Sequence, residues 1–270
     1  MKDKVKARLV GGGDCQDRNH YSRAETSSPT ISTSAIFIIA QEAAARGHTV
    51  ATIDIGSAYL NAAMPKKDPK KLVFMRITKE VASILTEIEP AFKPFTANDD
   101  TLVVELDKAL YGCIESALLW YQELVSFLPS IDFTPNPYDI CVLNKGKGGD
   151  RVTIGVYVDD IIITSPSSEA VAHTIKALQD KYVQLKIHQG KVHNYLGMVL
   201  DFSEAGYVHI NQTGMIQEIA KSPGVHNLEA AVGAAVKKPK TPSHDKLFQH
   251  SEDSAPLPAD LAKEIGRAHV

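Results

Sequence analysis

The sequence has 270 residues, of which 44% are hydrophobic and 23% charged, values typical of a folded globular protein and not of a fibrous or disordered one. With 29 Lys and Arg against 32 Asp and Glu, the formal net charge of -3 argues against a nucleic-acid binder that depends on overall basicity. The cysteines form no C-x-x-C pair and no apolar run is long enough for a signal peptide or a membrane span, so we expect a soluble, intracellular chain without disulfides.

Apolar residues at helical spacing recur along the chain, and Gly47 is placed to end the first such segment. The predicted helices are residues 34–46, 80–88, 115–128, 168–182 and 212–221.

Short β-branched or alternating runs predict strands, and the Gly-rich residues 145–150 predict a hairpin turn. The predicted strands are residues 4–10, 50–55, 72–77, 102–106, 140–144, 152–158, 161–164, 183–187, 195–202 and 207–210. Hairpins and helices without regular β-α-β alternation predict an α+β fold. The composition of residues 237–242 predicts an extended linker.

Two adjacent carboxylates, Asp159 and Asp160, interrupt the apolar residues 154–163. A tight turn is one interpretation, because Asp favours turns. Neighbouring carboxylates beside so much apolar sequence also repel each other and lose hydration, and a divalent cation relieves both costs. Asp54, at the end of another apolar strand, is a candidate third ligand. This set suits Mg²⁺, with Mn²⁺ as an alternative, and two such ions about 3.5–4 Å apart promote in-line displacement at phosphorus.

Residues 157–160, Tyr-Val-Asp-Asp, resemble the Y-x-D-D signature of reverse transcriptases, and residues 54–61 resemble the motif that contributes their first catalytic aspartate. Further segments narrow the resemblance to the copia-type LTR retrotransposon polymerases. In the order of the family, these segments are residues 6–10, 25–29, 110–112 with 120–121, 195–197 and 240–242.

The resemblance implies a right-hand polymerase core whose palm is an antiparallel sheet backed by helices. The implied parts are fingers at 1–50 with an insertion at 65–105, palm at 51–64 and 106–202, partial thumb and linker at 203–250, and a tail at 251–270. Residues 265–270 match what a common sequencing adapter encodes, and we exclude them from the fold as an assembly artefact.

The implied activity is RNA-directed DNA synthesis, in which a primer 3′-hydroxyl attacks a dNTP. Asp54, Asp159 and Asp160 would be the catalytic carboxylates and metal ligands. Ile55 would add a backbone carbonyl ligand or simply pack. Tyr157 would belong to the substrate-binding residues.

Three further residues would bind the nucleotide. Tyr59 would lie beneath the incoming sugar, where a ring excludes a 2′-hydroxyl, with core packing as the alternative. Lys6 and Arg8 share one face of the predicted strand and would meet the triphosphate, with solvated surface as the alternative.

The sequence departs from the family pattern after Tyr-Gly, where Lys, Gln, Pro and Arg are common and this chain has Ile114, Glu115, Ala117 and Leu118. Two positive charges are absent, and Glu115 replaces the amide that touches the nucleotide, so Glu115 is also a substrate-binding candidate. The three carboxylates are intact, and we expect retained metal chemistry.

Two alternatives stay open: a catalytically inactive or co-opted nucleic-acid-binding remnant, and an RNA-templated RNA polymerase of the palm fold, against which Tyr59 argues. The resemblance implies an RNA template, a DNA primer and product, dNTPs, and the rest of a Pol polyprotein, with ribonuclease H and integrase outside this chain. It also implies a cytoplasmic retrotransposon particle, with the nucleus as an alternative location.

Basic residues gather locally at residues 2–8, 66–71 and 237–240, in segments that would belong to the fingers and thumb. We therefore expect weak binding to nucleic acid, with an affinity that depends strongly on the salt concentration.

Overall fold

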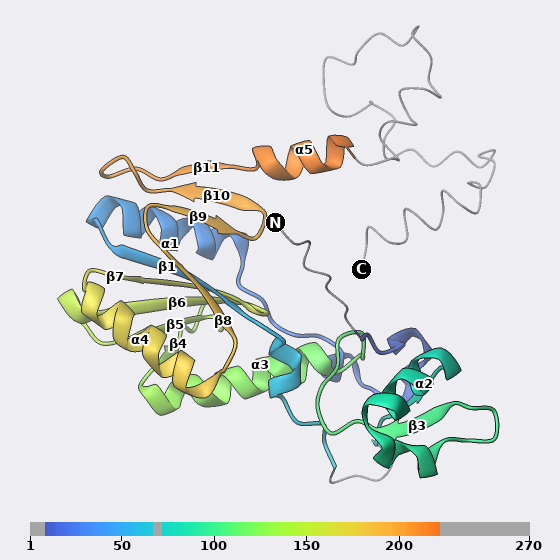
Figure 1. The fold of residues 1–270 in the computed structure, drawn as a ribbon. Helices are drawn as coiled ribbons and strands as arrows, with labels where there is room; N and C mark the ends of the chain where they lie inside the picture. The colour runs from blue at the N-terminus through green and yellow to red at the C-terminus, as the bar shows by residue number, and fades with distance from the viewer. Residues whose placement is uncertain (1–8, 67–71, 222–270) are drawn as a thin grey trace, which may run out of the picture. The chain divides into compact units, whose positions relative to one another are not determined.

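The structure is a computed structural model that describes residues 9–66 and 72–221 (Figure 1). The chain divides into two compact units, Met1–Ile210 and Asn211–Val270. Residues 1–8 lie outside the described residues, so residues 4–8 of the predicted first strand, with Lys6 and Arg8, are not described. The same holds for residues 67–71 and the predicted linker. Leu9 and Val10 are irregular and exposed.

A six-stranded antiparallel sheet forms the centre of the first unit, in the order β4-β5-β6-β7-β1-β8. Its strands are β1 (Thr49–Ile55), β4 (Thr134–Pro135), β5 (Val142–Lys145), β6 (Val152–Tyr157), β7 (Asp160–Ser165) and β8 (Leu185–Gln189). The predicted hairpins at 145–150 and at Asp159 are confirmed, since β5 pairs with β6 and β6 with β7. The predicted α+β class with antiparallel pairing is therefore confirmed.

Alternation along the strands assigns each side chain to one face of this sheet. Cross-strand pairs place Thr52, Ile162 and Gly155 in one row on one face. The helix α1 (Thr33–Arg46) packs against β6 and β7 on this face. A Cβ at Gly155 would lie only 2.7 Å from Ile31 Cδ1 in the segment entering α1, so the absence of a side chain permits the close approach.

The ends of α1 follow from local chemistry. The Ser32 side chain accepts a hydrogen bond from the Ala35 amide, and Gly47 ends the helix in the left-handed conformation at φ 63°. The predicted helix over 34–46 is confirmed.

Two helices cover the other face of the sheet: α3 (Ser116–Phe127) and α4 (Ser168–Lys181) (Figure 1). Their contact is aromatic, because Tyr182 meets both Trp120 and Phe127 edge to face, with ring centroids 5.3 and 5.8 Å apart. The predicted helices over 115–128 and 168–182 are confirmed.

The prediction of one strand over residues 195–202 is wrong. The structure has a hairpin of β9 (Val192–Tyr195) and β10 (Met198–Asp201), with Tyr195 paired to Met198. Leu196 and Gly197 turn the chain with φ of 51° and 73°, the backbone of a two-residue hairpin turn. A leucine at the first turn position makes the apolar run look continuous, so the strand pattern missed the reversal, whereas the resemblance of residues 195–197 to the family's hairpin agrees with it.

The β9–β10 hairpin continues into β11 (His209–Asn211), in the order β11-β10-β9. On the carboxylate-bearing side of the large sheet, β9 crosses β1, where buried His193 Nδ1 lies 3.2 Å from Thr52 Oγ1. The strand predicted over 183–187 begins two residues later as β8, and Val183 is exposed.

A smaller two-stranded sheet, β2 (Phe74–Ile77) with β3 (Leu102–Glu105), has its own apolar cluster of Ile77, Ala82 and Leu102. The helix α2 (Lys79–Ile88) supplies Ala82, so the predicted strands and helix of this segment are confirmed.

In the second unit, α5 (Thr213–Lys221) confirms the last predicted helix. The remaining described helices are short. The 3-10 segments include Gly13–Cys15, Arg18–His20, Arg23–Glu25, Ala58–Asn61, Pro90–Phe95 and Leu128–Ile131. All three cysteines are free. Over the described ranges, no helix has both the length and the apolar character needed to cross a membrane.

Candidate active site

Four neighbouring strands bring four polar side chains into one row at one end of the large sheet. Tyr157 on β6 pairs with Asp160 on β7, Asp160 pairs with Asp54 on β1, and Asp54 pairs with Lys186 on β8. Residues 106 positions apart in sequence, Asp54 and Asp160, are thus direct cross-strand neighbours. The four side chains lie on the same face of the sheet as α1 and β9, which cover that face further along the strands.

Asp159 lies on the turn between β6 and β7, beside this row. Its carbonyl accepts a hydrogen bond of 3.0 Å from the Ile55 amide, which ties the turn to the end of β1. The Ile55 side chain is fully buried. The turn therefore brings the third predicted carboxylate close to the other two.

Negative charge is concentrated at the row. Burial and, to a lesser extent, the nearby Asp159 and Asp54 carboxylates raise the pKa of Asp160 to about 6, against the opposing effect of Lys186. A carboxyl group so placed resists ionisation unless a cation compensates its charge.

Lys186 is that cation in this structure. Its ammonium group forms an ion pair with Asp54, and the hydrogen bond that it donates to the Asp54 carboxylate raises the pKa of Lys186. No sequence pattern singled out Lys186, because one lysine in a predicted strand is ordinary. Only the register of β8 against β1 brings it to Asp54.

The donor chemistry of the site fits a divalent cation, since three carboxylates offer the hard oxygen ligands that Mg²⁺ prefers. Within residues 9–66 and 72–221, however, no three acidic, histidine or cysteine side chains are already gathered into a metal-binding arrangement. Asp54 faces Lys186 instead. A metal bound by all three carboxylates would compete with Lys186 for Asp54.

Tyr59 is on the 3-10 helix that follows β1, and it lies close to the carboxylates. Its ring stacks on Tyr111, with centroids 4.3 Å apart and planes at 26°. Burial raises the pKa of Tyr59, and the Asp159 carboxylate adds to the rise, which shows that the two side chains are near each other. Tyr157 is partly exposed beside the same site.

Glu115 is buried at the start of α3 and is already bound on both carboxylate oxygens. Tyr21 donates its hydroxyl to one oxygen and Gln16 donates its amide to the other, both at 3.0 Å. Gln16 also accepts a 2.8 Å hydrogen bond from the Ile114 amide. Burial, assisted by Glu115, raises the pKa of Tyr21 to about 12. Glu115 thus anchors residues 16–21 to α3, and its contact with a nucleotide stays a prediction.

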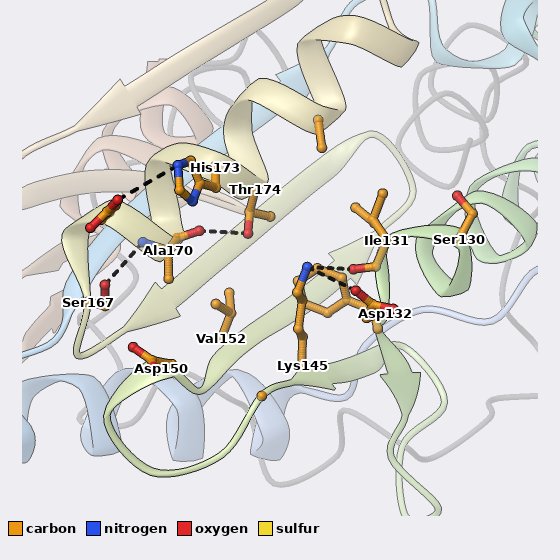
Figure 2. A pocket seen from close by; sticks show the side chains of 14 residues that line it. Ser130, Ile131, Asp132, Lys145, Asp150, Val152, Ser167, Ala170, His173 and Thr174 are labelled. Atoms are coloured by element: carbon orange, nitrogen blue, oxygen red, sulfur yellow. Dashed lines mark hydrogen bonds and ion pairs between the residues drawn. The ribbon is translucent and has the colours of Figure 1, made fainter.

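A hollow of about 550 Å³ lies elsewhere, between α4, the β5–β6 hairpin and the segment after α3 (Figure 2). Several of its polar groups already bond to other residues that line it. Lys145 donates to the Ile131 carbonyl at 2.9 Å and pairs with Asp132 at 3.5 Å, and Thr174 donates to the Ala170 carbonyl at 2.8 Å. None of the carboxylates of the row lines it, so the candidate site is the open row and not this hollow.

Comparison with known proteins agrees with the geometry. The family model described as reverse transcriptase (RNA-dependent DNA polymerase) matches residues 1–236. The chain is 26% identical over 264 residues to the retrovirus-related Pol polyprotein from transposon RE2 of Arabidopsis thaliana, covering 98% of this chain and 16% of that protein. It is 28% identical over 217 residues to the corresponding polyprotein from transposon RE1 of the same plant, covering 80% of this chain and 13% of that protein.

Among solved structures, the chain is similar to apo telomerase from Candida tropicalis truncated from its C-terminal domain, at 10% identity and a TM-score of 0.36, over 68% of this chain and 40% of that one. It is also similar to telomerase from Candida albicans in complex with a fragment of telomeric RNA, at 10% identity and a TM-score of 0.32, over 68% of this chain and 36% of that one.

The family match covers well over half of the chain, and the predicted resemblance to copia-type retrotransposon Pol polyproteins is confirmed, although the chain spans only a small part of their length. The chain therefore belongs to the reverse transcriptase (RNA-dependent DNA polymerase) family.

Proposed function

We propose that this chain is the RNA-directed DNA polymerase module of a retrotransposon Pol polyprotein, which transfers a nucleotide from a dNTP to a primer 3′-hydroxyl. The observation that carries the proposal is the convergence of Asp54, Asp159 and Asp160 at one end of an antiparallel sheet. Family membership supports the same assignment.

We assign the parts of a right hand by sequence position. Residues 51–64 and 106–202 would be the palm, since they contain the large sheet, and residues 65–105 would be an insertion of the fingers. Residues 1–50 would complete the fingers, and residues 203–250 would begin the thumb. The separate apolar cluster of the β2–β3 sheet supports treating 65–105 as its own part.

Asp54, Asp159 and Asp160 would hold Mg²⁺, or Mn²⁺ in its place, with Ile55 offering its carbonyl as a further ligand. When bound, the metal lowers the pKa of the primer hydroxyl and stabilises charge on the phosphates. The protein's own part is to hold the carboxylates in one row and to compensate their repulsion, a task that Lys186 performs in this structure.

Tyr59 would select the sugar. Its ring lies near Asp159 and stacks on Tyr111, which supports the proposal that it would meet the sugar of a nucleotide bound at the carboxylates. Tyr157, Lys6, Arg8 and Glu115 remain candidates for contacts with the substrate.

Primer extension on poly(rA) with an oligo(dT) primer, dTTP and Mg²⁺ tests the proposal directly. We expect incorporation by the wild-type chain, and a loss of at least about 100-fold in Asp159→Asn, since removing one catalytic charge costs several kcal/mol of transition-state stabilisation. Wild-type incorporation no higher than that of Asp159→Asn would contradict the proposal.

A catalytically inactive nucleic-acid-binding remnant is the second candidate, and the ion pair of Asp54 with Lys186 favours it. Thermal melting during titration with Mg²⁺ or Mn²⁺ separates the two. A polymerase should gain stability with metal and lose that gain in Asp54→Asn, whereas a remnant should show no metal response but still bind primer–template.

An RNA-templated RNA polymerase is the remaining alternative. Because the Tyr59 ring would exclude a 2′-hydroxyl, Tyr59→Ala should gain ribonucleotide incorporation. A wild-type chain that already uses ribonucleotides as well as deoxynucleotides would favour this alternative.

The proposed partners are an RNA template, a DNA primer and product, dNTPs, and the other segments of a longer Pol polyprotein, including ribonuclease H and integrase. We propose a cytoplasmic retrotransposon particle as the site of action.

A further inference from the structure

The turn that presents the two adjacent carboxylates has an unfavourable backbone. Val158, directly before Asp159, has φ of 54°. The left-handed region is costly for an L-residue, and most of all for a β-branched one, whose Cβ substituents crowd the neighbouring carbonyl. Something outside the turn must therefore keep Val158 in this conformation.

A side chain from the opposite face of the sheet contacts this residue. The indole Nε1–H of Trp120 on α3 donates a 2.7 Å hydrogen bond to the Val158 carbonyl. Trp120 is 1% exposed, and its ring packs edge to face on Tyr182. Packing in the core therefore fixes the position of the indole N–H that bonds to the turn.

The next carbonyl along the turn is fixed from another direction, because Asp159 accepts the hydrogen bond of the Ile55 amide. Two successive carbonyls, at Val158 and Asp159, are therefore bound by two different elements, α3 and β1. Together these bonds set where Asp159 and Asp160 stand relative to Asp54.

We propose that Trp120 is a positioning residue of the active site, which holds the strained Val158 turn by its indole hydrogen bond and so keeps Asp159 and Asp160 in register with Asp54. Trp120 touches neither substrate nor metal and acts only through the backbone of the turn. The role in catalysis rests on the proposed function, but the hold on the turn does not.

Hydrogen exchange at two adjacent amides tests the hold without any need for activity. The Ile55 amide bonds to the Asp159 carbonyl of the turn, whereas the Gly56 amide bonds to the Gln184 carbonyl at 2.7 Å, away from the turn. If Trp120 holds the turn, loss of its N–H should speed exchange at Ile55 by roughly five-fold or more, the change expected for one buried hydrogen bond, and leave Gly56 unchanged.

Two replacements remove the donor. Trp120→Phe removes it together with part of the ring. Trp120 is the only tryptophan of the chain, so replacing tryptophan by benzothienylalanine during expression puts sulfur in place of the N–H at this one site and keeps the ring shape. This isosteric protein keeps the test decisive should Trp120→Phe fail to fold. Tyr182→Phe is the matched control, since it alters the same aromatic cluster but leaves the indole hydrogen bond.

Val158→Gly provides a complementary test of the same hydrogen bond. Glycine adopts positive φ without the steric cost, so the turn should no longer depend on Trp120. We expect Val158→Gly to restore slow exchange at Ile55 in the Trp120→Phe background. Equal changes at Ile55 and Gly56, or no change at Ile55 in the isosteric protein, would overturn the proposal.

The same variants separate this inference from the proposed function. In a working polymerase, the isosteric protein should need several-fold more Mg²⁺ than the wild type for half of its thermal stabilisation, and Tyr182→Phe should not. A wild type without any Mg²⁺ response would refute the proposed function, and the exchange at Ile55 would still decide whether Trp120 holds the turn.

Discussion

Tyr59 and Tyr111 lie ring on ring at 4.3 Å, so the proposed sugar selector depends on its neighbour for orientation. Tyr111→Ala removes the support and should raise ribonucleotide incorporation relative to deoxynucleotide incorporation by about ten-fold, because an aromatic pair contributes about 0.5–1.5 kcal/mol beyond burial. The ratio of kcat/KM for dTTP and UTP measures the effect. Tyr111→Phe keeps the ring and should keep the wild-type ratio, and equal ratios in all three proteins would argue against this support.

Glu115 stands where the family commonly has glutamine, and it is buried against Tyr21 and Gln16. Glu115→Ala should destabilise the fold by roughly 1–3 kcal/mol, because it removes the acceptor of two part-buried hydrogen bonds, from Tyr21 and Gln16. Glu115→Gln should cost less than about 1 kcal/mol, since the amide oxygen still accepts a hydrogen bond. Denaturant unfolding measures both free energies.

The same Glu115→Gln variant tests the substrate contact. Removing a negative charge near an anionic triphosphate should lower KM for dNTP, and an unchanged KM would restrict Glu115 to its anchoring role.

His193 gives the protein a pH-dependent stability term. Burial lowers the pKa of this ring, which lies against Thr52 and the Gly190 carbonyl and near His188. A histidine with a lowered pKa in the folded state binds protons more readily when unfolded. It therefore costs stability as the pH falls below the ordinary histidine value of about 6.5.

We expect the free energy of unfolding to fall between pH 7.5 and pH 5.5 and to fall less in His193→Gln, which cannot take up a proton. Urea unfolding at the two pH values measures this difference. Identical pH dependence in the two proteins would exclude His193 as its source.

At the scale of elements, β6 and α1 are in close contact at Gly155. An added Cβ would lie 2.7 Å from Ile31 Cδ1 and 2.9 Å from Ile162 Cγ2. Gly155→Ala should therefore lower the free energy of unfolding by about 1–3 kcal/mol through overpacking. Gly149→Ala, in the β5–β6 turn with open space around the new Cβ, is the control and should change stability by less than about 0.5 kcal/mol. Similar effects of the two changes would show that the α1 contact tolerates expansion.

Most helices and strands could be predicted because their signals are local. Ser32 and Gly47 mark the ends of α1, and residues 145–150 mark the β5–β6 turn. The β9–β10 turn did not follow from the strand pattern, because the apolar Leu196 adopts positive φ at the first turn position, although the family resemblance of residues 195–197 pointed to a hairpin.

For the molecule as a whole, a net charge of -3 must be reconciled with the proposed binding to a polyanion. Lys66, the one described residue of the basic segment 66–71, is already paired with Glu105 and Asp107. We therefore expect few free phosphate contacts and a weak primer–template complex. Raising the salt from 50 to 200 mM should raise its dissociation constant roughly 100-fold, the loss for about four phosphate contacts.

Fluorescence anisotropy with a labelled primer–template measures this salt dependence. Asp159→Asn keeps the basic residues and should show the same slope of log Kd against log salt. A change below about three-fold in the wild type would mean that electrostatic contacts contribute little to binding.

Motifs and periodicity were enough to predict the family, the α+β class and the three acidic candidates, because both are local properties of the chain. Other partners of the site residues emerged only from the fold. Strand register brought Lys186 to Asp54, and helix packing brought Tyr111 to Tyr59 and Trp120 to Val158. Such partners cannot be read from the chain, because pairing between distant segments depends on register and packing that no local pattern encodes.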